Sequence, residues 1–178
     1  MPLVRLFFAV LPDCVTRRCI TAVAQALKLD AASPRVPPEN YHMTLAFVGE
    51  VPASQVATLR KIGGSQRASG CTLRFDAYEY WPEAEVIVAA AREIPSSLER
   101  LWQQIHADLA QHNQALEHTR LRAHVTIARK VPQAPVLQAM SAFAWKVQAF
   151  SLMQSNTAGA RPIYTVVDTW QLLDEDAS

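Results

Sequence analysis

The chain is poor in the residues on which several large classes of binding site depend. It has only five glycines in 178 residues, and no glycine-rich phosphate loop, Walker signature or dinucleotide fingerprint occurs. Its three cysteines, Cys14, Cys19 and Cys71, are an odd number without the spacing of metal ligands, so we expect reduced thiols. These shortages argue against the common nucleotide-binding classes and against a cysteine-ligated metal centre.

Excess charge and long apolar runs are also missing. The formal net charge is +1, so no overall field attracts nucleic acid, and any recognition of an anion must be local. No stretch is long enough to cross a membrane. The apolar start of the chain is interrupted by Arg5 and ends at Pro12-Asp13 without a small-residue cleavage site, which argues against a signal peptide. We therefore expect a cytoplasmic protein that binds no membrane.

Two short stretches of similar pattern stand out instead, HMTLAFV at residues 42–48 and HVTIARK at 124–130. They share His, Thr and Ala at the first, third and fifth places, with apolar residues between. This alternation is typical of a half-buried strand, whose successive side chains point to opposite faces. It predicts that His42, Thr44 and Ala46 share one face and that His124, Thr126 and Ala128 share another. It also predicts that the two His-Thr pairs surround one ligand.

The remaining pattern predicts an α+β fold. Strands are expected at 6–11, 42–48, 71–80, 86–91, from near Leu121 through the second motif, at 145–154 and at 163–173, and helices at about 20–27, 53–62 and 96–109. Ser96 and Glu99 have the spacing of a capping box at the start of the last helix. At this length we expect one domain, residues 1–178, that buries roughly 70% of its unfolded surface.

The order of these elements suggests two lobes. Each motif follows a predicted helix, and this repetition favours two similar halves related by a pseudo-twofold axis, with antiparallel sheets lining a central groove and helices packed outside. Across that axis the two His-Thr faces would meet.

Two imidazoles that face one ligand suit general acid–base catalysis. Histidine titrates near neutral pH, so one ring can accept a proton while the other donates one, and each transfer accelerates a reaction by about 10²–10⁴-fold. Thr44 and Thr126 would donate hydroxyl hydrogen bonds to phosphate oxygens. Arg120 and Arg122 share the strand parity of His124 and would add positive charge.

Other interpretations of these residues stay open. A metal site built on His42 and His124 lacks a third ligand at a convincing interval, so we expect no metal and no cofactor. A protein that binds RNA ends without catalysis is a second alternative. His106, His112 and His118 are spaced by six and share no helix face, so we expect surface or boundary positions. Among the four tryptophans, expected in the core or at its rim, Trp81 beside Pro82 could border the groove.

The doubled His-x-Thr-x motif resembles that of the two-histidine phosphoesterase superfamily, and most closely its RNA 2',3'-cyclic phosphodiesterase branch, also called the 2'-5' RNA ligase family. Family-like segments follow in the expected order along nearly the whole chain: RLFFA at 5–9, PENYH at 38–42, LAFVGE at 45–50, HVTIAR at 124–129, FSL at 150–152, Ser155, and Tyr164-Thr165. Two positions depart from the family pattern. Ala123 stands where proline is frequent, and Ile127 replaces the commoner leucine.

The resemblance implies a bilobal α+β fold and metal-independent hydrolysis of RNA or nucleotide 2',3'-cyclic phosphate ends to 2'-phosphomonoesters. It implies that His42 is the proton donor and His124 the proton acceptor. The same site would join 2'-5' linkages reversibly when a 5'-hydroxyl replaces water, and another cyclic or 2'-5'-linked nucleotide is an alternative substrate. We expect RNA ends or nucleotides as partners of a monomer.

The resemblance also makes Phe47 and Arg129 candidates for contacting the nucleotide, because an aromatic face and a guanidinium plane both suit base stacking. Simple alternation places both on the face opposite the histidines. They reach the groove only if each strand bends or bulges near its end.

Overall fold

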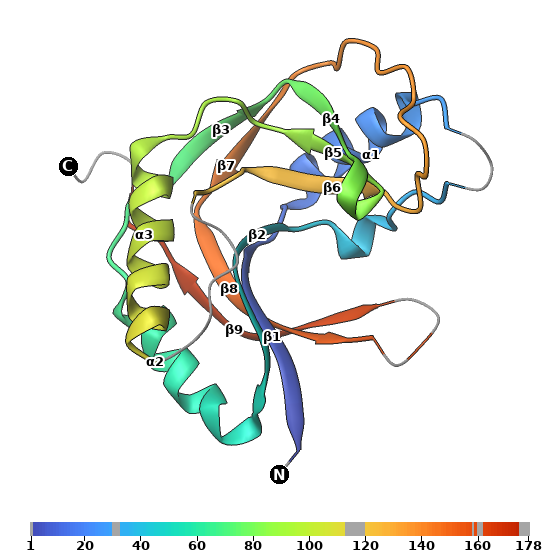
Figure 1. Ribbon diagram of the computed structural model, residues 1–178. Coiled ribbons are helices and arrows are strands. Elements are labelled where there is room, and N and C mark those ends of the chain that lie inside the picture. Colours follow the sequence, from blue (N-terminus) through green and yellow to red (C-terminus); the bar gives the residue numbers. More distant parts are fainter. Residues whose placement is uncertain (1, 30–32, 113–119, 158, 160–161, 175–178) are drawn as a thin grey trace.

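The computed structural model describes the chain except residues 1, 30–32, 113–119, 158, 160–161 and 175–178 (Figure 1). The described residues form three α-helices, α1 (Cys14–Ala26), α2 (Val56–Ser65) and α3 (Ser96–Gln111), and nine strands. Three single turns of 3₁₀ helix, η1 (Pro38–Asn40), η2 (Ala53–Gln55) and η3 (Pro82–Ala84), join them. All strand pairs between these elements are antiparallel. The predicted α+β class with antiparallel sheets is confirmed; the bilobal, pseudo-twofold arrangement stays a prediction.

The largest sheet has four strands in the order β2 (Met43–Pro52), β1 (Leu3–Val10), β8 (Ala149–Asn156) and β9 (Ile163–Gln171). The continuous apolar run of β1 is buried from Leu6 to Val10, because this strand lies inside the sheet between β2 and β8. A buried central strand of this kind needs apolar residues on both faces.

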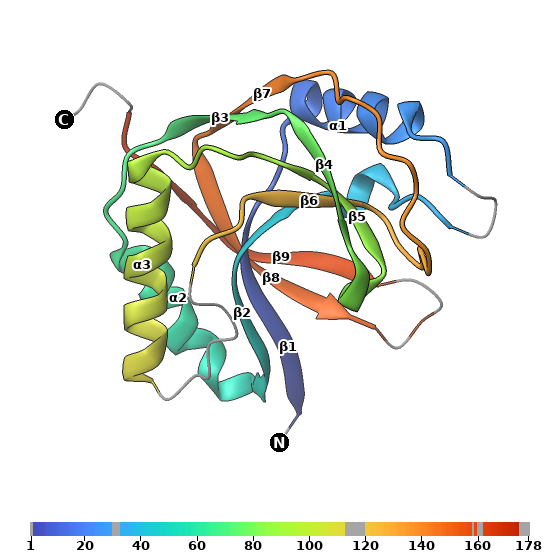
Figure 2. The same cartoon turned by 45° about the horizontal axis from the view of Figure 1, so that its top comes forward.

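A second sheet has three strands in the order β4 (Ala77–Trp81), β5 (Val86–Ala90) and β6 (His124–Ala128), and β3 (Cys71–Phe75) pairs separately with β7 (Phe143–Val147). Figure 2 shows β6 next to β2 of the first sheet, and the two strands are in contact. The first motif thus belongs to an edge strand of one sheet and the second motif to an edge strand of the other.

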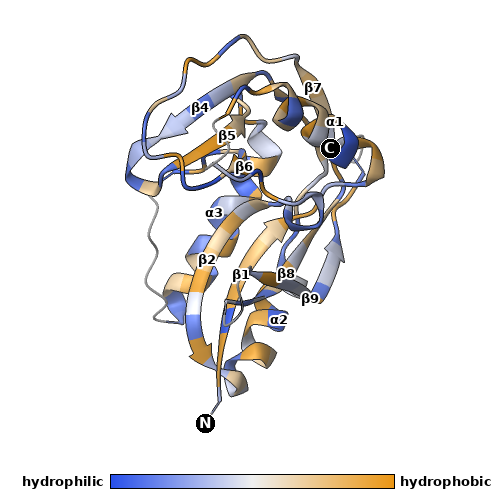
Figure 3. Cartoon of the chain, turned by 90° about the vertical axis from the view of Figure 1, so that its right-hand side faces the viewer, coloured by the Kyte–Doolittle hydropathy of each residue, from blue (hydrophilic) through white to orange (hydrophobic). Residues whose placement is uncertain are grey.

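The helices pack outside these sheets. α1 contacts β6 and β7, α2 contacts β8 and β9, and α3 contacts α2 and β2 (Figure 1). Figure 3 shows apolar segments on β1, β2 and α2. One large buried cluster contains apolar side chains from the four-stranded sheet, the three-stranded sheet, the β3–β7 pair and all three helices. Full burial of each large apolar side chain contributes about 1.5–3 kcal/mol, so this common core fixes the position of both motif strands. No helix of the described residues is long and apolar enough to span a membrane.

Two of the predicted strands are each divided in the structure. Residues 71–80 form β3 and β4, which are separated at Asp76 and pair with different partners. Residues 145–154 belong to β7 and β8, separated at Gln148. Alternation is a local signal and does not show where a chain leaves one sheet for another, so the prediction of single strands was wrong.

The start of one helix, α3, and the start of one strand, β6, also differ from the prediction. The capping box is absent, because Pro95 is the N-cap and its carbonyl accepts from the N–H groups of Leu98 and Glu99. Ser96 is therefore the first helical residue. The second motif strand begins at His124 rather than near Leu121.

Candidate active site

Each motif holds its histidine and threonine half-buried between fully buried apolar neighbours. His42 immediately precedes β2 and His124 is the first residue of β6. The intervening residues, Met43 and Leu45 in one motif and Val125 and Ile127 in the other, are at most 3% exposed. The alternation predicted from the sequence is confirmed over His-x-Thr-x in both strands. It was wrong for Ala46 and Ala128, which were predicted on the histidine faces and are at most 2% exposed, because each strand bulges at the residue before the alanine.

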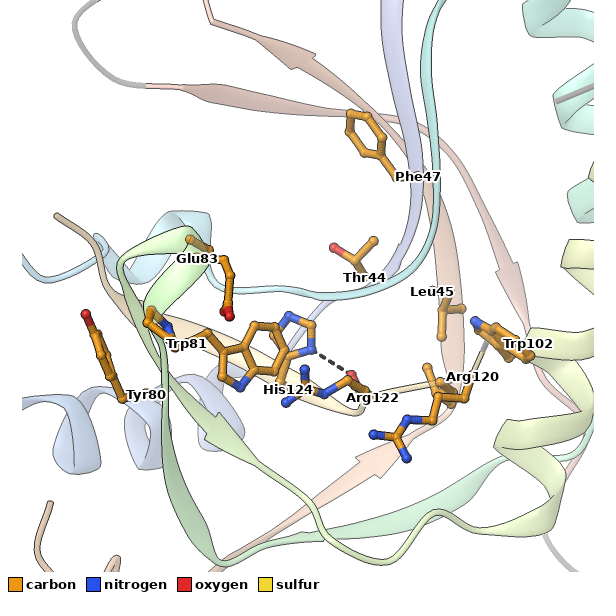
Figure 4. Close-up of a pocket in the computed structure, with 13 residues that line it drawn as sticks. Thr44, Leu45, Phe47, Tyr80, Trp81, Glu83, Trp102, Arg120, Arg122 and His124 are labelled. Carbon is orange, nitrogen blue, oxygen red and sulfur yellow. Dashed lines mark hydrogen bonds between the residues drawn. The ribbon is translucent and has the colours of Figure 1, made fainter. Parts of the chain in front are cut away.

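The two imidazoles are held in the same way. Nδ1 of His42 lies 2.8 Å from the carbonyl oxygen of Asn40, two residues earlier. Nδ1 of His124 lies 2.6 Å from the carbonyl oxygen of Arg122, again two residues earlier (Figure 4). A carbonyl oxygen can only accept, so Nδ1 is the donor in both rings. In both rings Nε2 is therefore the nitrogen that can exchange a proton with a ligand.

The motifs combine across the two sheets. One cavity, of about 430 Å³, is lined by Thr44 of the first motif and His124 of the second. A neighbouring cavity, of about 330 Å³, is lined by His42 of the first motif and Thr126 of the second. Each cavity therefore contains the histidine of one motif and the threonine of the other.

A third cavity, of about 340 Å³, shares His42 with the second cavity and Thr44 with the first. Because the third cavity shares lining residues with each of the other two, the three cavities form one groove that passes both motifs. All six residues predicted for the site border it: His42, Thr44, Phe47, His124, Thr126 and Arg129. Arg120, Arg122 and Trp81 border it too.

Phe47 reaches this groove because β2 bulges. In the pairing with β1, Ala9 is opposite Thr44 and Phe8 is opposite Ala46, so Leu45 is an extra residue on β2. One extra residue reverses the alternation beyond it. Phe47 thereby moves to the face of Thr44, and Figure 4 shows both on one side of the cavity, with Trp81, Arg122 and His124 on the other.

A similar irregularity precedes Arg129. In the pairing of β5 with β6, Ile87 is opposite Ala128 and Val88 is opposite Thr126, so Ile127 is the extra residue. The N–H of Arg129 then donates to the carbonyl of Pro34 at 3.1 Å. The condition set by the sequence, a bulge near the end of each strand, is met in both motifs.

His106 on α3 supports the first bulge. Its Nε2 donates to the carbonyl of Leu45, the extra residue, at 3.1 Å, and the side chain is 8% exposed. Trp102 packs on the same ring at 4.1 Å between centroids. The expectation that His106 lies at the surface or boundary was wrong. His112 is exposed as expected, and His118 lies outside the described residues.

His42 sits between aromatic rings and a cation. Its ring centroid is 5.1 Å from that of Phe7 and 4.9 Å from that of Tyr164. Burial lowers the pKa of His42 below its ordinary value of 6.5, the hydrogen bond to the Asn40 carbonyl opposes this, and the positive charge of Arg129 lowers it further. In the free protein the neutral ring is favoured.

The surroundings of His124 are different. They are held together by the carboxylate of Glu79, a residue that belongs to no sequence motif. Oε2 of Glu79 accepts from Nε1 of Trp81 at 2.9 Å and from the guanidinium of Arg122 at 3.0 Å. The guanidinium lies 3.8 Å from the Trp81 ring centre, and that ring lies 4.4 Å from the His124 ring. Trp81 thus borders the groove, which the sequence offered only as an alternative to a place in the core or at its rim.

Metal ligands do not gather around these rings. Among the residues that the structure describes, no group of three or more His, Cys, Asp or Glu side chains is placed to hold an ion. The arrangement offers two imidazoles, two hydroxyl donors and the guanidinium groups of Arg120, Arg122 and Arg129 around one groove, which suits proton transfer at a phosphate.

Sequence comparison identifies two similar curated proteins. Both are named RNA 2',3'-cyclic phosphodiesterase. The protein from Escherichia coli (strain K12) is 30% identical over 171 residues, which cover 94% of this chain and 96% of that protein. The protein from Thermus thermophilus is 26% identical over 187 residues, covering 96% of this chain and 91% of that protein.

Structural comparison leads to the same group. The crystal structure of Escherichia coli LigT complexed with 3'-AMP matches with a TM-score of 0.86 and 28% sequence identity, covering 97% of this chain and all of that one. The family model described as the 2'-5' RNA ligase superfamily matches residues 12–176, which include both motifs and every described strand except β1. The chain therefore belongs to the 2'-5' RNA ligase superfamily.

Proposed function

We propose that this protein hydrolyses 2',3'-cyclic phosphate ends of RNA or nucleotides to 2'-phosphomonoesters, with two histidines and no metal ion. The observation that carries the proposal is the crossed arrangement, in which His42 with Thr126 and His124 with Thr44 line adjoining cavities of one groove. The names of both curated relatives, RNA 2',3'-cyclic phosphodiesterase, agree with it.

In the proposed reaction a water oxygen attacks phosphorus and the bond from phosphorus to the 3'-oxygen breaks. Nε2 of His124 takes the proton of the water, and Nε2 of His42 gives a proton to the 3'-oxygen. Each transfer is worth about 10²–10⁴-fold in rate. The hydroxyls of Thr44 and Thr126 donate to the non-bridging oxygens, where hydrogen bonds to charged groups are worth about 1.5–3 kcal/mol each.

The charge balance at His42 suits a proton donor. Burial and Arg129 lower its pKa in the free protein, which makes the protonated ring a stronger acid. The bound diester brings a negative charge that opposes the effect of Arg129 and favours the protonated ring. The negative charge of the bound substrate therefore favours protonation of His42, the proposed acid.

The nucleoside of the cyclic phosphate would lie on the His42 side. Phe47, Arg129 and Tyr164 line the cavity there together with His42. The Arg5 guanidinium lies 4.8 Å from the Phe47 ring centre, so one guanidinium already covers that ring. Aromatic and guanidinium planes stack on any base, which predicts little selectivity among the four bases.

The direct test is hydrolysis of adenosine 2',3'-cyclic phosphate by the purified protein. His42→Gln and His124→Gln should each lower kcat/KM by about 10²-fold or more, as expected for loss of a general acid or base. His112→Gln is the matched control, because His112 is exposed at the end of α3 and should keep the full rate.

Two results would count against the proposal. Tight binding of the cyclic nucleotide with no product would favour a protein that binds RNA ends without catalysis. Turnover only of another cyclic or 2'-5'-linked nucleotide would indicate a different activity within the superfamily.

A cytoplasmic monomer is also part of our proposal, and size-exclusion chromatography tests the oligomeric state.

A further inference from the structure

A single oxygen atom of Glu79 links two residues that both contact His124. Oε2 of Glu79 accepts from the indole Nε1 of Trp81 at 2.9 Å and from the guanidinium of Arg122 at 3.0 Å. The Trp81 ring lies 4.4 Å from the His124 ring between centroids, and the Arg122 carbonyl accepts from Nδ1 of His124 at 2.6 Å (Figure 4). Glu79 itself lines none of the three cavities of the groove.

We propose that Glu79 is a positioning residue for the general base His124. It fixes the indole on which the imidazole packs, and it fixes the side chain of the residue whose carbonyl the imidazole binds. Nε2 of His124 is thereby kept pointing at the water that attacks phosphorus. The inference rests on the proposed function, because it concerns the proton transfer assigned there to His124.

The strand pairing puts these side chains on one face of the three-stranded sheet. Ala90 of β5 is opposite Ala77 of β4 and opposite His124 of β6. Paired residues share a face, and so do residues two apart on a strand. Glu79 and Trp81 therefore lie on the face of His124. The Trp81 ring packs on a buried apolar surface that β5 provides between them, formed by Val86, Val88 and Ala90.

Packing on this apolar surface does not by itself fix the orientation of the indole. The hydrophobic effect has no preferred direction, whereas the hydrogen bond from Nε1 of Trp81 to Glu79 has one. The guanidinium of Arg122 lies 3.8 Å from the Trp81 ring centre, so it covers the ring while it binds the same carboxylate oxygen. With both bonds made, the indole keeps one orientation against the imidazole.

The first motif is held by a similar arrangement. Nδ1 of His42 donates to the carbonyl of Asn40 at 2.8 Å, and the Asn40 side-chain amide donates to the carbonyl of Pro162 at 3.1 Å. In both motifs the residue two before the histidine binds the ring through its carbonyl and is anchored through its side chain to a distant segment. For the second motif that anchor is Glu79.

The energetics favour a role in geometry over a role in stability. The side chains of Arg122 and Glu79 are 49% and 39% exposed, and ion pairs this exposed contribute little to the free energy of unfolding. A misplacement of a reacting group by about 1 Å, in contrast, can lower a rate by about 10²-fold. Loss of the carboxylate should therefore slow the reaction in a protein that stays folded.

The first test measures kcat and KM for adenosine 2',3'-cyclic phosphate. Glu79→Ala should lower kcat at least about fivefold and leave KM unchanged, because the nucleoside is proposed to lie on the His42 side. Glu79→Gln keeps an oxygen that can accept from both partners, through weaker bonds without the charge, and should recover part of the loss. Glu99→Ala, at an exposed position of α3, is the control and should keep the wild-type kcat.

A double-mutant cycle separates positioning from general loosening of the sheet. If Glu79 acts through His124, Glu79→Ala should lower the residual rate of His124→Gln no further. NMR supplies a second readout, because the Trp81 ring shifts the resonances of the carbon-bound protons of the His124 ring. Glu79→Ala should move these resonances toward their positions in Trp81→Leu.

The outcomes distinguish this inference from the proposed function. An active wild type whose kcat falls less than about fivefold in Glu79→Ala overturns the inference alone. An equal loss in the wild-type and His124→Gln backgrounds does so too, and so do His124 resonances that stay in place. A wild type that does not hydrolyse the cyclic nucleotide refutes the proposed function, and the role of Glu79 fails with it.

Discussion

Thr44 and His124 come from different motifs and from different sheets, yet they line the same cavity. Thr126 and His42 line the neighbouring one. Neither copy of His-x-Thr-x therefore makes a site alone. The contact between β2 and β6 brings the two copies together, and the groove depends on the core that holds both sheets.

The first prediction concerns the threonine hydroxyls. Thr44→Val and Thr126→Val keep the branched shape that suits a strand and remove one donor each to a charged phosphate, a bond worth about 1.5–3 kcal/mol. Each should lower kcat/KM for the cyclic nucleotide by about 10- to 100-fold with an unchanged thermal midpoint. Thr72→Val, at an exposed position of β3, is the control. Full activity in both motif variants would show that the hydroxyls do not touch the phosphate.

The second prediction concerns the electrostatic coupling of Arg129 and His42. Arg129 contributes to the lowered pKa of His42, so Arg129→Ala should raise the pKa of that imidazole. NMR titration of the His42 ring measures this directly, with Arg18→Ala on the exposed face of α1 as the control. The same variant should raise KM for the nucleotide. A His42 pKa that stays constant on removal of the guanidinium would contradict the coupling.

The third prediction is a pH dependence of stability. The folded protein lowers the pKa of His42 below 6.5, so the unfolded chain binds this proton more tightly. The free energy of unfolding then falls as the pH drops from the ordinary pKa toward the lowered one. Denaturant unfolding at about pH 7.5 and about pH 5.5 should show a smaller loss in His42→Gln than in the wild type. Equal losses in both proteins would refute the shift.

The fourth prediction concerns the bulge at Leu45. His106→Leu leaves the Leu45 carbonyl without its buried donor, which costs about 1–3 kcal/mol of stability. Because the bulge sets the position of Phe47, we also expect KM for the nucleotide to rise. His106→Gln retains an N–H donor and should recover part of both effects. A KM unchanged by either variant would show that His106 supports the fold but not Phe47.

The sequence was sufficient for the parts of this site that depend on local pattern. The alternation in both motifs is a property of a few neighbouring residues, and it correctly predicted which residues of His-x-Thr-x are buried. It failed at Ala46 and Ala128, which are buried although they were predicted on the histidine faces. The bulges at Leu45 and Ile127 were not visible, because they depend on how β1 and β5 pair with the motif strands. Phe47 and Arg129 entered the prediction through family resemblance.

Glu79 and His106 were missed for the same physical reason. Their partners are distant in the chain: Glu79 binds Arg122, and His106 binds the carbonyl of Leu45. For His106 a signal did exist. It lies one turn after Trp102 and next to Ile105 of the apolar stripe of α3, so its place on the helix indicates contact with the core.

The most direct test of the central claim is the identity of the phosphomonoester formed from adenosine 2',3'-cyclic phosphate in excess chelator, followed by phosphorus NMR. Two histidines that act alone, with the 3'-oxygen as leaving group, predict that the adenosine 2'-phosphate accumulates at the same rate with and without chelator. Formation of the 3'-phosphate, or a rate that chelator abolishes and zinc restores, would contradict it.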